Sequence, residues 1–150
     1  MPSIIPSYIY SFLALSIVGT LLICTFSLFS VSLKQDVEIE QLKNVLEHLA
    51  AESCEIISTT QTNNSTVTVR IPMPSCLSEK QYWIQLKSDA LKTWFEGGIG
   101  NTPTQTNYKI FIPGMANASG LYFSSYGLAE LECQLQGSIV YLNLSQESKS

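Results

Sequence analysis

Residues 8–33 read YIYSFLALSIVGTLLICTFSLFSVSL, an apolar stretch of 26 residues that contains no charged side chain and no proline. About 20 such residues are enough to cross the hydrocarbon core of a bilayer. The first charge in the chain is Lys34. A cleaved signal peptide is the alternative, but residues 1–7 lack Lys and Arg and the apolar run is longer than a usual signal core. We therefore expect residues 1–33 to form a retained transmembrane or filament-core helix.

Small residues are spread along this segment and predict a face for packing against other helices. In lipid such residues let helix backbones approach closely and let hydroxyls form hydrogen bonds between helices. They are also common in any membrane helix, so an ordinary span is the alternative. The predicted assembly residues are Ser16, Gly19, Thr20, Ser27 and Ser30.

Residues 34–58 continue the helix as an amphipathic extension, because they contain neither Gly nor Pro. Apolar residues recur at steps of three and four and define a face that packs on another element. The six acidic and two basic side chains of this segment sum to −4, the formal net charge of the protein. The predicted packing residues are Ile39, Leu42, Leu46 and Leu49.

From residue 59 to 150 the pattern changes to the alternation of β-strands. Seven short alternating segments are separated by turn signals, and Gln136-Gly137-Ser138 predicts a hairpin. The sequence thus predicts an α+β protein: a long N-terminal hydrophobic and amphipathic helix, then a small antiparallel β-sandwich-like domain or a strongly curved sheet. The expected strands are 65–71, 81–87, 91–96, 108–112, 121–124, 129–136 and 139–144.

Cysteines and sequons favour an extracytoplasmic β domain. A Cys54–Cys76 disulfide is the preferred pairing in an oxidising space, with Cys133 as a buried thiol; three reduced thiols are the alternative. Four Asn-X-Ser/Thr sequons follow residue 60 and are candidate glycosylation sites, although Ser/Thr-rich chains also produce them by chance. The sequon residues are Asn63, Asn64, Asn117 and Asn143.

Composition argues against several functional classes. The net charge of −4 argues against nucleic-acid binding, which needs clustered Lys and Arg. His48 is the only histidine, and no paired carboxylates, Cys-His arrangement or metal-ligand cluster is recognisable, so we expect no enzyme, no metal and no cofactor.

The layout resembles archaeal type IV pilins and archaellin-like subunits. The resemblance rests on IIPSYIYSFLALSIVGTLLICTFSLF running unbroken into SVSLKQDVEIEQLKNVLEHLAAE, residues 4–52, followed by a Ser/Thr/Asn-rich β domain. It implies a cell-surface filament whose hydrophobic helices pack into a core after a basic leader is removed. No Lys or Arg precedes the apolar run here, so a mature form or a start assigned too late is expected.

Two roles remain in competition. The first is a structural filament subunit whose partners are membrane lipid and other copies or pilin-like subunits. The second is a single-pass membrane protein whose extracellular β domain binds a ligand or partner. For the second role, Trp83, Trp94 and Tyr122 are candidate exposed aromatics, with burial in a core or subunit contact as the alternative.

Overall fold

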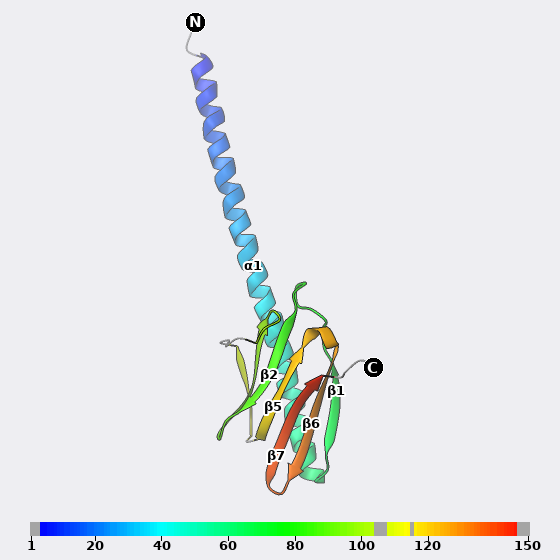
Figure 1. Cartoon of the computed structure of the whole chain (residues 1–150). Coiled ribbons are helices and arrows are strands. Elements are labelled where there is room, and N and C mark those ends of the chain that lie inside the picture. The colour runs from blue at the N-terminus through cyan, green and yellow to red at the C-terminus, as the bar shows by residue number, and fades with distance from the viewer. Residues whose placement is uncertain (1–3, 104–107, 115, 147–150) are drawn as a thin grey trace. The chain divides into compact units, whose positions relative to one another are not determined.

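A computed structural model describes residues 4–103, 108–114 and 116–146 of the chain. Within these ranges one long helix precedes seven strands, and a 3-10 turn lies between the fifth and sixth strands (Figure 1). The predicted α+β class is therefore confirmed. The elements are α1 (Ile4–Asn63), β1 (Val67–Pro72), β2 (Tyr82–Ser88), β3 (Thr93–Ile99), β4 (Lys109–Ile112), β5 (Ala116–Phe123), η1 (Ser124–Tyr126), β6 (Leu128–Gln136) and β7 (Ile139–Gln146).

The chain divides into two units, Met1–Val37 and Glu38–Ser150. The first unit contains the apolar part of α1, and the second contains the amphipathic turns of α1 and all seven strands. The division falls near the point where the charge-free sequence ends, and the turns of α1 that pack in the core lie beyond it.

Helix α1 ends at Asn63, five residues beyond the expected end at Ser58. In this last part threonine hydroxyls donate to backbone carbonyls, Thr59 to Glu55 and Thr62 to Ser58. Asn64 then adopts a left-handed φ of 49°, and its N–H donates to the Thr60 carbonyl at 2.9 Å. A left-handed residue with such a bond is a common way to end a helix.

The seven strands form one sheet in the order β1-β6-β7-β5-β2-β3-β4. Among the described strands the neighbours β5 and β7 run parallel, and the other neighbouring pairs are antiparallel. Of the two expected arrangements, the single sheet is present and the two-sheet sandwich is not: the seven strands form one mixed sheet, and α1 supplies the second layer. The predicted hairpin is present, since Gln136 pairs with Ile139 across the Gly137–Ser138 turn.

The core of the second unit lies between α1 and one face of the sheet (Figure 1). On that face alternate residues of the strands are buried. Leu131 on β6, Leu142 on β7 and Ile84 on β2 are fully buried there, and Leu42, Leu46 and Leu49 of α1 pack among them. In β2 and β3, Trp83 and Glu96 are buried on the opposite face as well.

Candidate functional site

The apolar part of α1 is the most unusual surface of the protein. From Tyr8 to Val37 every residue is exposed except Gly19, which is partly exposed. The large apolar side chains of this segment have exposed fractions between 46% and 74%. By length and composition this helix can cross a membrane. An apolar surface of this extent marks a place where lipid or protein replaces water.

Three hydroxyls of this segment have backbone partners that suit an apolar environment. Ser16 Oγ donates to the Phe12 carbonyl at 2.9 Å, and Thr20 Oγ1 donates to the Ser16 carbonyl at 2.8 Å. Thr25 Oγ1 likewise donates to the Leu22 carbonyl at 2.9 Å. Since each of these donors is satisfied inside the helix, none of them needs water.

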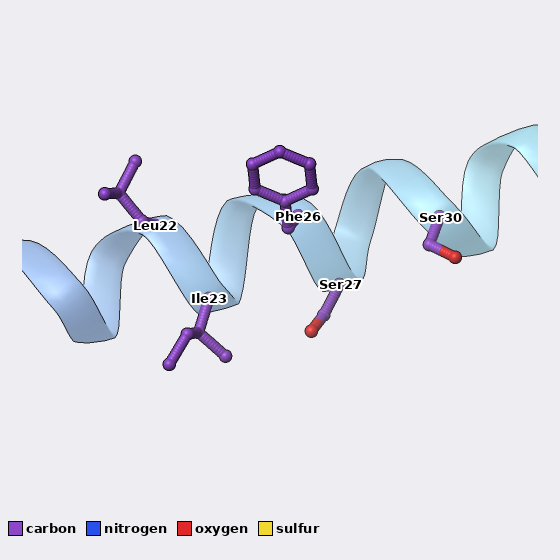
Figure 2. Close-up of a pocket in the computed structure, with 5 residues that line it drawn as sticks. All are labelled: Leu22, Ile23, Phe26, Ser27 and Ser30. Carbon is purple, nitrogen blue, oxygen red and sulfur yellow. The ribbon is translucent and has the colours of Figure 1, made fainter.

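The five predicted assembly residues share one face of α1. At about 100° per residue, Ser16, Gly19, Thr20, Ser27 and Ser30 fall within an arc of about 100°, with Ile23 in the same arc. Figure 2 shows part of this face, where an open hollow is lined by Leu22, Ile23, Phe26, Ser27 and Ser30. The short serine side chains leave a shallow depression beside bulky neighbours, and such a depression lets the backbone of a second helix approach closely.

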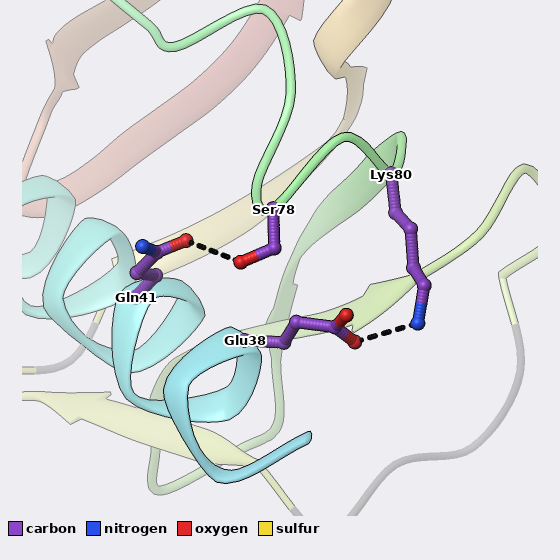
Figure 3. Close-up of polar contacts among 4 residues, drawn as sticks. All are labelled: Glu38, Gln41, Ser78 and Lys80. Atoms are coloured by element: carbon purple, nitrogen blue, oxygen red, sulfur yellow. Dashed lines mark hydrogen bonds and ion pairs between the residues drawn. The ribbon is translucent and has the colours of Figure 1, made fainter. Parts of the chain in front are cut away.

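A polar clamp joins α1 to the loop before β2. Lys80 Nζ donates to Glu38 Oε2 at 2.8 Å, and Ser78 Oγ donates to Gln41 Oε1 at 3.2 Å (Figure 3). The Glu38 side chain is only 10% exposed and that of Lys80 is 54% exposed. Such a charge-assisted bond is stronger than one between neutral groups. Sequence reasoning missed this clamp, because its partners lie about 40 residues apart and no motif connects them.

The loop turn that carries the clamp is a strained one. Ser78 and Glu79 both have left-handed φ angles, 48° and 67°, and neither is a glycine. Reciprocal backbone hydrogen bonds of 2.9 Å between Leu77 and Lys80 close the turn. A left-handed backbone at two ordinary residues costs energy and persists only when surrounding contacts fix it. The turn thus presents Ser78 and Lys80 to α1.

The predicted packing residues of α1 do face the sheet, with one difference. Leu42, Leu46 and Leu49 are buried in the core, whereas Ile39 is only partly buried. Gly97 on β3 makes room for the helix, since a Cβ there would come within 3.3 Å of Leu42 Cδ1 and 3.2 Å of Leu46 Cδ2. The helix therefore approaches β3 more closely than a larger residue would allow.

All four sequon asparagines lie on the surface. Asn63 and Asn64 are exposed at the end of α1. Asn117 lies within β5, which begins before the expected strand 121–124, and Asn143 lies on β7. Both are exposed on the sheet face that α1 leaves uncovered, on neighbouring strands.

The four cysteines are free thiols in the structure, so the expected Cys54–Cys76 disulfide is not formed. Cys54 is partly buried against the core, while Cys76 is exposed in the loop after β1. Cys133 is buried as expected, and burial raises the pKa of its thiol. Cys24 is exposed on the apolar part of α1.

The aromatic residues considered for ligand binding are mostly covered. Trp83 and Tyr122 are buried, at 1% and 0% exposure, and Trp94 is partly exposed. The assignment of Tyr122 to the outer face is wrong, because it pairs with Ile84 on the face that α1 covers. Its side chain packs near Tyr82, with ring centroids 6.4 Å apart.

The described residues contain no group of three or more His, Cys, Asp and Glu side chains placed to hold a metal ion. His48 is exposed on α1. Comparisons with protein-family models, with curated proteins and with solved structures found no match.

Proposed function

We propose that this protein is a structural subunit of a cell-surface filament, similar in build to archaeal type IV pilins. The observation that carries the proposal is the helix α1 itself. Its charge-free turns are exposed over their whole circumference, and its following turns are fastened to a sheet by a core and a polar clamp. Such a helix can lie in lipid as a stored subunit and in a bundle of identical helices as an assembled one.

The proposed partners are membrane lipid before assembly and other copies of the chain, or pilin-like subunits, afterwards. The small-residue face supports this, because close helix approach in a water-free core depends on such residues. The proposed role requires no cofactor, nucleic acid or catalytic group. We place the sheet domain outside the cell, where the exposed asparagine sequons would be accessible to glycosylation.

The test compares protein from the membrane fraction with protein from sheared surface material, using intact mass and N-terminal sequencing. Filament-derived chains with a processed N-terminus support the proposal. A chain that occurs only as a monomer in the membrane contradicts it and favours the anchored binding protein.

A matched pair of variants tests the helix face directly. Thr20→Leu with Ser27→Leu fills the small-residue face, while Thr25→Leu with Ser32→Leu makes the same two changes on the opposite side of α1. We expect the first variant to lower the yield of sheared filaments about tenfold or more, and the second to stay near the unmodified protein. Equal losses in both variants would show that the face has no special role.

A further inference from the structure

The edge strand β4 and the turn before β3 present an aromatic and basic surface on the sheet face opposite α1. We define this β4 surface as Leu91, Lys92, Trp94, Lys109 and Phe111. We call the unit Glu38–Ser150 the head. Leu91 is 77% exposed and Phe111 is 55% exposed, which is high for large apolar side chains of a folded domain. An open hollow of about 430 Å³ adjoins it, lined by Leu91, Lys92, Phe111, Ile112, Pro113 and Gly114.

Two lysine side chains on this surface place their ammonium groups over aromatic rings. Lys92 Nζ lies 5.5 Å from the centroid of the Phe111 ring, and Lys109 Nζ lies 5.5 Å from that of Trp94. The two rings pack against each other with centroids 6.1 Å apart. Positive charge over an aromatic face is a favourable and ordered arrangement.

Both lysines differ from the other cations of the head. In the described part of the chain, Lys80 pairs with Glu38 and Lys87 pairs with Glu96. Arg70 pairs with Glu130. Lys92 and Lys109 form no ion pair with any described carboxylate. The β4 surface therefore offers two positive charges that no described carboxylate pairs with.

The complementary charge lies on α1 of the same head. Residues 34–58 carry the whole net charge of −4, whereas residues 64–150 contain six acidic and six basic side chains. Glu40, Glu47 and Glu55 are exposed on the side of α1 that faces away from Leu42, Leu46 and Leu49. We name these three glutamates the acidic ridge. The Lys43–Glu47 contact of 3.6 Å joins two side chains more than half exposed, so it offsets little of this charge.

We propose that the β4 surface of one copy of this chain binds the acidic ridge of a second copy. Charge complementarity selects this occupant: the two lysines that pair with no described carboxylate lie on the β4 surface, and the domain's excess of anions lies on α1. Because the two surfaces differ, the contact is head-to-tail and leaves a free surface of each kind at the ends, which is how open-ended filaments grow. The inference rests on the proposed filament role and names the contact between neighbouring heads.

Photo-crosslinking of the full chain in its filaments tests the contact. Leu91 is replaced by p-benzoylphenylalanine in a mixture of isotope-labelled and unlabelled chains, and irradiated filaments are digested for mass spectrometry. We expect crosslinks between labelled and unlabelled chains, from position 91 to residues 40–58. The same probe at Thr68, an exposed residue of the other edge strand β1, is the control and is expected to miss this segment.

Charge variants provide an independent readout. Lys92→Gln with Lys109→Gln and Thr68→Glu with Gln136→Glu both change the net charge by −2, but only the first alters the β4 surface. We expect filament yield to fall several-fold in the first and little in the second. Lys92→Glu with Lys109→Glu should lower the yield about tenfold or more, and adding Glu47→Lys with Glu55→Lys to the same chain should restore it.

Each other outcome overturns the contact. Normal yield in the lysine variants would leave Lys92 and Lys109 with the general role of lysines at sheet edges, which is to prevent strand pairing. Crosslinks from position 91 to lipid would assign the surface to a membrane instead. Failure of the unmodified chain to assemble would overturn the filament role together with this contact, whereas normal filaments with crosslinks elsewhere would overturn the contact alone.

Discussion

Gly120 is the residue on which the parallel pairing of β5 and β7 depends. Its φ is +148°, and a Cβ at this position would collide with the Leu144 carbonyl on β7. We predict that Gly120→Ala lowers the free energy of unfolding by about 3 kcal/mol or more, because backbone atoms cannot move aside as a flexible side chain can.

Gly114→Ala is the control for that change. Gly114 also has a positive φ, +108°, but a Cβ there would meet nothing within 4 Å. Gly114→Ala should therefore lower the free energy of unfolding only by the cost of a positive φ at a non-glycine residue, about 1 kcal/mol. Chemical denaturation followed by tryptophan fluorescence measures the free energy of unfolding of both variants. Equal losses in the two variants would show that β7 moves aside for the added Cβ at no cost.

Tyr82 and Tyr122 predict how the head responds to alkaline pH. Burial raises the pKa of both phenols above the ordinary value near 10. The fold therefore favours their neutral form, and this contribution is fully present below about pH 10 and is lost as pH rises above it. We expect both rings to ionise only when the head unfolds, as measured by tyrosinate absorbance. Tyr82→Phe should reduce the alkaline loss of stability relative to the unmodified chain.

Individual residues were predictable where alternation decides their environment. Cys133 and Asn143 lie on regular strands, and their buried and exposed positions follow from their place in the pattern. Tyr122 was misassigned because the expected strand, residues 121–124, is too short to show which of its faces is buried. In the structure β5 begins at Ala116, and Ala116, Ala118 and Tyr122 share the buried face. The pairing of Cys54 with Cys76 could not be judged from the sequence, since it depends on where a loop lies in space.

At the scale of elements, the clamp between α1 and the loop before β2 is open to a double-mutant cycle. Glu38→Gln, Lys80→Met and the double variant should give a coupling energy of about 1 kcal/mol, because Glu38 is largely shielded from water. The control is the Lys43–Glu47 pair on the exposed side of α1, for which we expect about 0.3–0.5 kcal/mol. A coupling energy at Glu38–Lys80 no larger than that of the control would show that the clamp does not stabilise the fold more than an exposed ion pair does.

Every expected strand overlaps a strand of the structure, because alternation within a run of four to nine residues is a local property. The ends of elements were less predictable. The helix extends five residues beyond the expected end, through a Ser/Thr-rich stretch that disfavours helices in isolation. Strand β5 begins earlier than expected, where Thr93 Oγ1 and Ser88 Oγ form hydrogen bonds with the backbone of Ala116 and Ala118. These contacts come from residues that are distant in sequence.

At the scale of the whole molecule, the division at residue 37 predicts separable behaviour. The core and the clamp lie within Glu38–Ser150. We therefore expect a chain of residues 34–150 to fold cooperatively and stay soluble without detergent, whereas the full chain requires detergent or lipid. Circular dichroism melts and size-exclusion chromatography measure this. Aggregation of the short chain would show that the apolar turns are needed for the head to fold.

The number of layers could not be predicted from the sequence. Seven amphipathic strands suit either two facing sheets or one sheet covered by a helix. The choice depends on whether the stripe of Leu42, Leu46 and Leu49 covers the sheet or pairs with another molecule. The stripe itself was predicted, but the close approach at Gly97 that allows it to cover the sheet was not.

The place of β7 in the sheet has a consequence for the order in which the head is made. β6 bonds only β1 and β7, and β5 bonds only β2 and β7 among the described strands. Without Ile139–Gln146 the sheet separates into a two-stranded piece and a four-stranded piece. Because a ribosome makes this strand last of the seven, the nascent head stays open until it emerges, and a chain crossing a membrane as it is made completes its fold only on the far side.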